Sequence, residues 1–326
     1  VQLYTGNGTA IGSNGKVVTF DDTDTDMQPD LVWIKDRSDT FAHQVHDSVR
    51  GASAGYLSTD GQGTEQSSYP ISSFNSDGWT TKSGGTGGQN ESGDAFVSWN
   101  WKESATAGFD IANFTGNGSA RTISHSLSAV PKMIITKNIA TTSSWTVYHH
   151  KFASDPETDY LYLDTNGAVA DWVGHWNDTA PTSSVFTVGT DASTNGDGNT
   201  IVAYCFADVQ GFSKFGSYVG NGNANGTFVF TGMRPAFVLF KGLASNREWI
   251  IADNKRDTYN LVDEVLYANA KDAAGTSAMV DFLSNGFKLR HAAGPGTINT
   301  SGETYIYAAF AEAPLVNSNG VPCNAR

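Results

Sequence analysis

The sequence predicts an all-β protein made of three tandem antiparallel β-sandwich modules of jelly-roll-like form. The first observation behind this prediction is composition, because the 326 residues include 35 Gly, 12% aromatic residues and only 16% charged residues. Such a chain is typical of many short strands joined by tight turns. The second observation is an internal repeat, in which three sequence blocks return three times in the same order.

The first block ends a predicted opening strand with Gly-Asn-Gly, and it occupies residues Tyr4–Gly8, Phe114–Gly118 and Tyr218–Gly222. The second block is a proline, an apolar run and a lysine, and it occupies Pro29–Lys35, Pro131–Lys137 and Pro235–Lys241. The third block is an Asn- and Gly-containing turn followed by an aromatic or β-branched strand, and it occupies Asn90–Val97, Asn195–Val202 and Asn299–Ile306. The first glycines of the three copies lie 110 and 104 positions apart, so each copy is about a hundred residues long.

Each block has a physical interpretation. Gly-Asn-Gly tolerates positive φ and suits a tight reversal after the opening strand. A proline can begin a strand, and apolar residues at consecutive positions indicate that this strand is covered on both faces. The copies divide the chain into modules at residues 1–103, 108–209 and 211–316, with a polar tail at 317–326. Because the linkers are so short, we expect the modules to pack against one another.

Charge and hydropathy exclude several classes of partner. The net charge of −13 and the pI near 4.8 oppose nucleic-acid binding, which depends on Lys and Arg at phosphates. No apolar run reaches the length of a membrane span, so we expect a soluble protein without a membrane partner. Cys205 and Cys323 are too few for a disulfide framework, and we expect both to be free thiols.

Motifs of catalysis and cofactor binding are not found in the sequence. It has no Gly-x-Ser-x-Gly elbow, phosphate loop, His-Glu-x-x-His or Cys-x-x-Cys, so we predict a non-enzymatic protein with no cofactor and no metal centre. The acidic run Asp21–Asp26 is predicted to be a solvated loop, and Ca²⁺ binding there stays open. Asp-x-x-Arg appears at Asp47 and again at Asp253, where we expect an ion pair that braces a turn.

One loop of the second copy carries the candidate ligand-binding residues, which are Trp172, His175, Trp176 and Asn177. Aromatic faces stack on sugar rings, and the polar side chains can bond to sugar hydroxyls. In the alternative interpretation, the two tryptophans hold the loop against its own module or lie in a contact between modules.

Three longer strings, at residues 124–137, 203–218 and 305–314, together with the Gly-Asn-Gly motifs, resemble an uncharacterised repeat domain family. That family occurs in virion structural and tail-fibre-like proteins of tailed bacteriophages of marine and cyanobacterial type. The resemblance implies a component of the virion exterior with other virion proteins as partners, and it implies no catalytic residues.

We therefore expect a host-contacting tail fibre or spike protein. The alternatives are a capsid head fibre or decoration protein and a lectin-like module that binds host cell-surface polysaccharide. A polysaccharide depolymerase would need paired carboxylates in a groove, and the sequence shows no recognisable pair. A homotrimer and a pseudo-threefold single chain both remain open.

Overall fold

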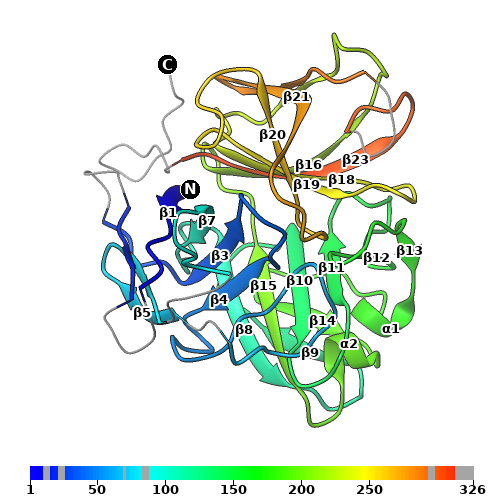
Figure 1. The fold of residues 1–326 in the computed structure, drawn as a ribbon. Helices are drawn as coiled ribbons and strands as arrows, with labels where there is room; N and C mark the ends of the chain where they lie inside the picture. The colour runs from blue at the N-terminus through cyan, green and yellow to red at the C-terminus, as the bar shows by residue number, and fades with distance from the viewer. Residues whose placement is uncertain (10–14, 21–25, 69–70, 83–87, 293–297, 313–326) are drawn as a thin grey trace.

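The computed structural model describes residues 1–9, 15–20, 26–68, 71–82, 88–292 and 298–312, and it is an all-β fold (Figure 1). The first copy contains the strands β1 (Gln2–Thr5), β2 (Val17–Val18), β3 (Leu31–Asp36), β4 (Gln44–Asp47), β5 (Ile71–Asn75), β6 (Gly78–Thr81) and β7 (Ala95–Trp101). The second copy contains β8 (Phe109–Thr115), β9 (Arg121–Ser124), β10 (Met133–Asn138), β11 (Trp145–His149), β12 (Asp159–Tyr162), β13 (Ala170–Asp171), α1 (Val173–Trp176), β14 (Val185–Val188), α2 (Ala192–Asn195) and β15 (Thr200–Phe206). The third contains β16 (Ser213–Val219), β17 (Phe228–Phe230), β18 (Phe237–Gly242), β19 (Trp249–Asp253), β20 (Val262–Tyr267), β21 (Gly275–Leu283), β22 (Gly286–Leu289) and β23 (Thr304–Phe310).

The three copies build their main sheets in one order. The opening strand pairs with the closing strand, which pairs with the strand after the proline, which pairs with the next strand in sequence. These orders are β1-β7-β3-β4, β8-β15-β10-β11 and β16-β23-β18-β19, all antiparallel. The sheet of the second copy continues through β12 and β13, and that of the third copy continues to eight strands and is nearly closed, like a barrel.

The strands that follow the prolines are buried over their whole length, as their consecutive apolar residues predicted. One face of each sheet contributes to a central hydrophobic cluster that combines residues of all three copies, among them Trp33, Trp145 and Trp249. The other faces pack in three smaller clusters, one in each copy. The largest core is therefore shared, and the sheets alone do not divide the chain into three separate sandwiches.

Hydrogen bonds connect the copies in a ring. In each copy, an aromatic ring at or next to the start of β4, β11 or β19 hydrogen-bonds to a backbone carbonyl of a neighbouring copy. The three contacts are Trp145 Nε1 to Ser58 O at 2.7 Å, Trp249 Nε1 to Tyr162 O at 2.9 Å, and His43 Nε2 with Tyr267 O at 3.0 Å. Because the last contact joins the first copy to the third, the ring is closed.

The lysines at the ends of the apolar runs are buried for a related reason. Lys137 Nζ donates to the Gln62 carbonyl at 2.9 Å, and Lys241 Nζ donates to the Gly167 carbonyl at 2.9 Å, in each case in the preceding copy. The ammonium of Lys35 is held by the carbonyls of Asp36 and Asp39 at 2.6 and 3.1 Å. Burial lowers the pKa of all three lysines to about 8.

The Gly-Asn-Gly motif and the asparagine of the third block form a clasp in each copy. In the third copy the Asn221 N–H donates to Asn299 Oδ1 at 2.9 Å, and the Gly222 N–H donates to Asn299 O at 2.9 Å. The second glycine has positive φ, as predicted, at 71° for Gly222. The first glycine is required by close approach instead, because a Cβ on Gly220 would lie 2.3 Å from the Thr300 carbonyl oxygen.

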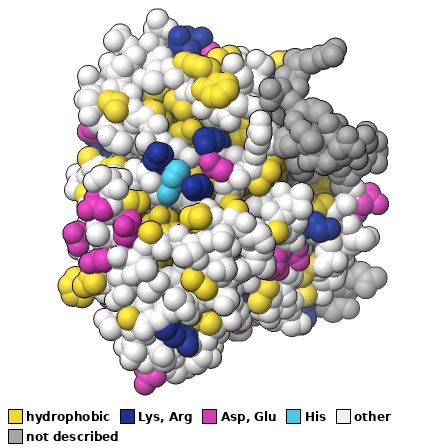
Figure 2. Space-filling model, turned by 180° about the vertical axis from the view of Figure 1, so that it is seen from behind, with side chains coloured by type: hydrophobic (Ala, Val, Ile, Leu, Met, Phe, Trp, Pro, Cys, Tyr) yellow, Lys and Arg dark blue, Asp and Glu magenta, His cyan; other side chains and the backbone are white. Residues whose placement is uncertain are grey.

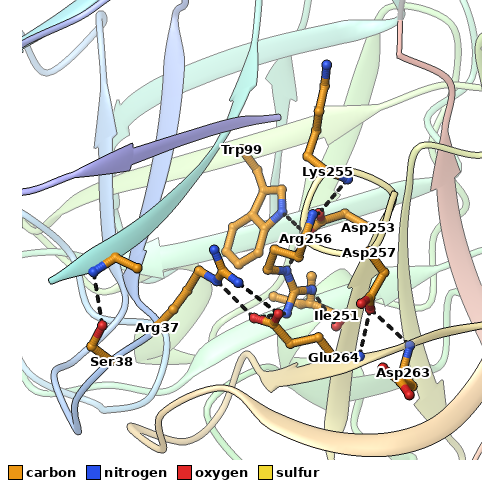
Figure 3. Close-up of polar contacts among 11 residues, drawn as sticks. Arg37, Ser38, Trp99, Ile251, Asp253, Lys255, Arg256, Asp257, Asp263 and Glu264 are labelled. Carbon is orange, nitrogen blue, oxygen red and sulfur yellow. Dashed lines mark hydrogen bonds and ion pairs between the residues drawn. The ribbon is translucent and has the colours of Figure 1, made fainter. Parts of the chain in front are cut away.

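Buried ion pairs lie at the junctions of the first copy with its two neighbours. Arg256 Nε bonds to Asp253 Oδ2 at 2.6 Å, and the same oxygen accepts from Trp99 Nε1 of the first copy at 3.0 Å (Figure 3). Asp47 pairs with Arg50 in the same way and accepts from Tyr204 Oη of the second copy at 2.7 Å. The predicted ion pairs are present, and they brace the junctions as well as the turns.

Candidate functional site

The loop predicted to bind a ligand lies on the flank of the second copy, where β12, β13 and α1 meet (Figure 1). Trp172 precedes α1, and its backbone N–H donates to the Thr158 carbonyl at 3.0 Å. Its side chain is 51% exposed. The indole lies close over Gly174, where a Cβ would stand 2.1 Å from Trp172 Nε1, so a glycine there lets the ring lie against the helix.

The other predicted residues divide between surface and interior. Asn177 ends α1 in the left-handed conformation with φ of 54° and is exposed. Trp176 is 2% exposed and packs edge-on against Tyr148, with ring centroids 6.0 Å apart. His175 is also buried. Trp176 therefore holds the loop to its own copy, as the alternative interpretation proposed, while Trp172 and Asn177 are accessible.

Two tyrosines that the sequence analysis did not select complete the aromatic surface. Tyr160 and Tyr162 of β12 are half-buried, and their ring centroids are 4.9 Å apart. The buried His175 ring packs edge-on against Tyr160, with ring centroids 4.3 Å apart. Tyr160 and Tyr162 are two residues apart on a strand, so both point to the same face, a spacing that could have identified them.

Carboxylates gather on the other face of the same two strands. Asp159 of β12 pairs in register with Asp171 of β13, and Asp155 lies nearby. Partial burial, together with the charges of Asp171 and Asp155, raises the pKa of Asp159. Viewed from behind, this flank shows acidic side chains gathered beside exposed hydrophobic ones (Figure 2). On the aromatic side, the carboxylate that hydrogen-bonds the Trp172 side chain is Asp191.

Beneath the surface, His175, Ser193 and Asp191 form a hydrogen-bonded group. Ser193 Oγ donates to Asp191 Oδ1 at 2.6 Å and lies 3.3 Å from His175 Nδ1, and it also contacts Thr146 Oγ1 at 2.9 Å. In a catalytic relay the histidine stands between the serine and the carboxylate. Here the serine stands between the histidine and the carboxylate, and its hydroxyl donates to Asp191. Asp191 is also the N-cap residue of α2.

The protonation states fit a structural role for this group. Burial lowers the pKa of His175 to about 4, against the opposing effect of Asp191, so the imidazole is neutral at pH 7. Burial would raise the pKa of Asp191, but hydrogen bonds from the Ser193 hydroxyl and backbone N–H bring it below its usual range. We infer that the group fixes the loop geometry under the aromatic surface.

Residues 1–314 match a family described as a domain of unknown function, DUF7483. The chain belongs to this family. The match covers all three copies, so the family corresponds to the whole ring of sheets and not to a single repeat. No match was found among curated proteins or among solved structures.

The remaining sequence predictions for this DUF7483 chain concern metal binding, the acidic run, the cysteines and a membrane span. Among the described residues, no three His, Cys, Asp or Glu side chains are grouped as metal ligands. The first five residues of the acidic run Asp21–Asp26, Cys323 and the tail at 317–326 lie outside the described residues. Cys205 is a buried free thiol, as expected. In the described part of the chain, neither helix has the length or apolarity needed to cross a bilayer.

Proposed function

We propose that this DUF7483 chain is a non-enzymatic structural protein on the exterior of a tailed-bacteriophage virion, in a tail fibre or spike that contacts the host. The resemblance of its repeat strings to phage virion proteins supports this assignment. We further propose that each copy acts as one β-sandwich module, with the three modules packed around the shared core. A ring closed by hydrogen bonds and buried ion pairs suits a protein that must keep its shape outside the cell.

The position in the particle is tested by immunoelectron microscopy. Purified phage particles that contain the chain are labelled with an antibody against it and viewed in negative stain. Label on the tail supports a fibre or spike, and label on the head supports the alternative of a head fibre or decoration protein. Particles that carry no label anywhere would refute the virion assignment.

We propose that host contact occurs through polysaccharide at the aromatic surface of Trp172, Tyr160 and Tyr162. The observation that carries this proposal is the half-exposed Trp172 side chain on the same sheet face as the two tyrosines. A pyranose ring can stack on the indole while its hydroxyls donate to the partly exposed Asp191.

The test compares wild type and Trp172→Ala in binding to purified host envelope polysaccharide. We expect about two- to tenfold weaker binding, since an aromatic stacking contact contributes roughly 0.5–1.5 kcal/mol. Phe230→Ala is the matched control, because Phe230 is a 65% exposed aromatic residue of the third copy. Equal binding by wild type and Trp172→Ala would remove the aromatic surface from the proposed function.

A further inference from the structure

Strand β17 forms one edge of the eight-stranded sheet of the third copy, and among the described strands it pairs with β22 alone. The Thr227 carbonyl and the Thr231 N–H bond toward β22, so the odd-numbered residues of β17 direct their backbone groups into the sheet. The opposite edge strand, β16, reaches β17 at its start, where Thr227 Oγ1 donates to the Val219 carbonyl at 2.9 Å. The N–H and C=O of Phe228 and Phe230 point to the open side, and no described residue bonds to them.

The side chains of the same two residues are exposed. Phe228 is 45% exposed and Phe230 is 65% exposed, whereas Val229 between them is buried in the core of the third copy. Edge strands of soluble proteins usually carry charged residues or proline, which keep other strands from pairing with them. Strand β17 has neither, so its backbone edge and its outer face are both open to another chain.

The second copy shows that the module does not need these rings. In its equivalent strand, β9, Ile123 is buried in the same way as Val229. The residues on either side of Ile123 are Thr122 and Ser124, and both are exposed. Two phenylalanines therefore stand where the other copy has two small hydroxyl residues. Since the module folds without them, the rings of β17 indicate a contact surface.

The sequence around β17 reads the same in both directions. Residues 226–232 are Gly-Thr-Phe-Val-Phe-Thr-Gly, with Val229 at the centre. When two such strands pair antiparallel about a two-fold axis at Val229, each Phe228 lies opposite Phe230 of the second chain. These are the residues whose backbone groups point to the open side, so each opposed pair can exchange both backbone hydrogen bonds. The outward rings of the two chains then lie side by side on one face.

We propose that β17 is a self-association surface, at which two copies of this chain pair antiparallel through residues 226–232. The contact joins the eight-stranded sheets of two chains edge to edge. Strand β17 makes none of the three hydrogen bonds that connect the copies in a ring, so each ring stays closed within its own chain.

The proposal stands independently of the phage assignment and of the aromatic surface on the second copy. At concentrations low enough to keep the chain monomeric, Phe230→Ala still serves as the control for polysaccharide binding, because β17 and the aromatic surface belong to different copies.

Sedimentation velocity of the full chain over a concentration series tests the association. We expect the wild type to pass reversibly from monomer to dimer, because a contact through one short strand is small. The double variant Phe228→Thr with Phe230→Ser has the outward residues of β9 in β17. Its dimerisation should be weaker by about a hundredfold or more, because two rings on each chain no longer leave water.

The melting temperature of the double variant, measured where both proteins are monomeric, should stay within a few degrees of the wild type, because the second copy folds with these residues. A wild type that stays monomeric at every concentration would overturn the proposal. A folded double variant that dimerises as strongly as the wild type would do the same.

Disulfide trapping tests the register of the two strands. The background is Cys323→Ser, which leaves the buried Cys205 as the remaining native thiol. Because Phe228 lies opposite Phe230 of the second chain and not opposite its own equivalent, a mixture of Phe228→Cys and Phe230→Cys chains should form far more disulfide dimer than either chain alone. Tags of different mass identify the mixed dimer on a non-reducing gel. A mixture that forms no more dimer than the separate chains would overturn the two-fold pairing.

Discussion

Raising the pH from 7 to 9 should stabilise this protein, because three lysines are buried at the ends of Pro-initiated strands. Lys35, Lys137 and Lys241 have side chains with no exposed surface, and their pKa values are lowered from 10.5 to about 8. Between pH 8 and 10.5 the folded state therefore binds fewer protons than the unfolded state. Stability rises with pH in that window, since unfolding takes up protons and these become scarcer as the pH rises.

The size of the effect follows from the same values. For one lysine the shift from 10.5 to about 8 gives a gain of about 1 kcal/mol between pH 7 and pH 9, and about 3 to 4 kcal/mol for all three. Two other groups act near this window in opposite directions, because burial lowers the pKa of the Val1 amino group from 8.0 and raises the pKa of the Cys205 thiol well above 9.0. Burial lowers the pKa of His46 and His149 to about 3, so their contribution is complete below pH 7.

Urea unfolding at pH 7, 8 and 9 measures the gain as a rise in midpoint at constant slope. Lys137→Met should reduce the gain by about a third, whatever its effect on stability at pH 7, because one of the three titrating groups is removed. A free energy of unfolding that is flat or falls between pH 7.5 and 9 would refute the assignment of these lysines as buried bases with lowered pKa.

Three further substitutions test the packing. Trp176→Ala should cost about 3–5 kcal/mol in urea unfolding, whereas Trp172→Ala should cost less than about 1 kcal/mol because its indole is half-exposed; equal costs would contradict the placement of the two rings. Arg256→Met should lower the free energy of unfolding by about 3–5 kcal/mol, because it leaves the Asp253 carboxylate buried without its arginine. The double variant with Asp253→Leu should recover part of that loss, and no recovery would indicate a steric defect instead. Gly6→Ala should lower the melting temperature, because its Cβ would lie 1.8 Å from a backbone oxygen; an unchanged melting temperature would show that the turn can move aside.

The repeat made much of the sheet arrangement accessible from sequence alone. Pro29, Pro131 and Pro235 each precede a strand buried on both faces, as the run of consecutive apolar residues predicted. The shared core could not be predicted from the sequence. A strand that its own module covers on both faces has the same run of apolar residues as a strand that a neighbouring module covers on one face. The extension of the third sheet to eight strands also had no clear signal in the repeat.

The candidate site was predicted in part. The cluster Trp172–Asn177 was identified by its aromatic and polar residues, but sequence could not tell which tryptophan points inward. That choice depends on the single turn of α1, which sends Trp176 toward Tyr148 and leaves Trp172 outside. Tyr160 was missed because it comes from a different strand and joins Trp172 only through pairing of β12 with β13.

One of the three junctions between copies uses different chemistry from the other two at the equivalent position. Asp47 and Asp253 each accept a hydrogen bond from the neighbouring closing strand, from Tyr204 and from Trp99. The residue at that place in the second copy is His149, which bonds through Nε2 to the Tyr307 carbonyl at 3.3 Å. An aspartate there would face a carbonyl oxygen and have no donor.

The copies are therefore not interchangeable around the ring, although their strands follow one order. Exchanging His149 for aspartate would create a buried, unpaired carboxylate, because the second copy has Phe152 where the others have arginine. The junction at His149 thus differs from the two junctions at Asp47 and Asp253. Such differences favour closure of the ring within one chain over association of like copies from separate chains, since a mismatched junction would leave buried polar groups without partners.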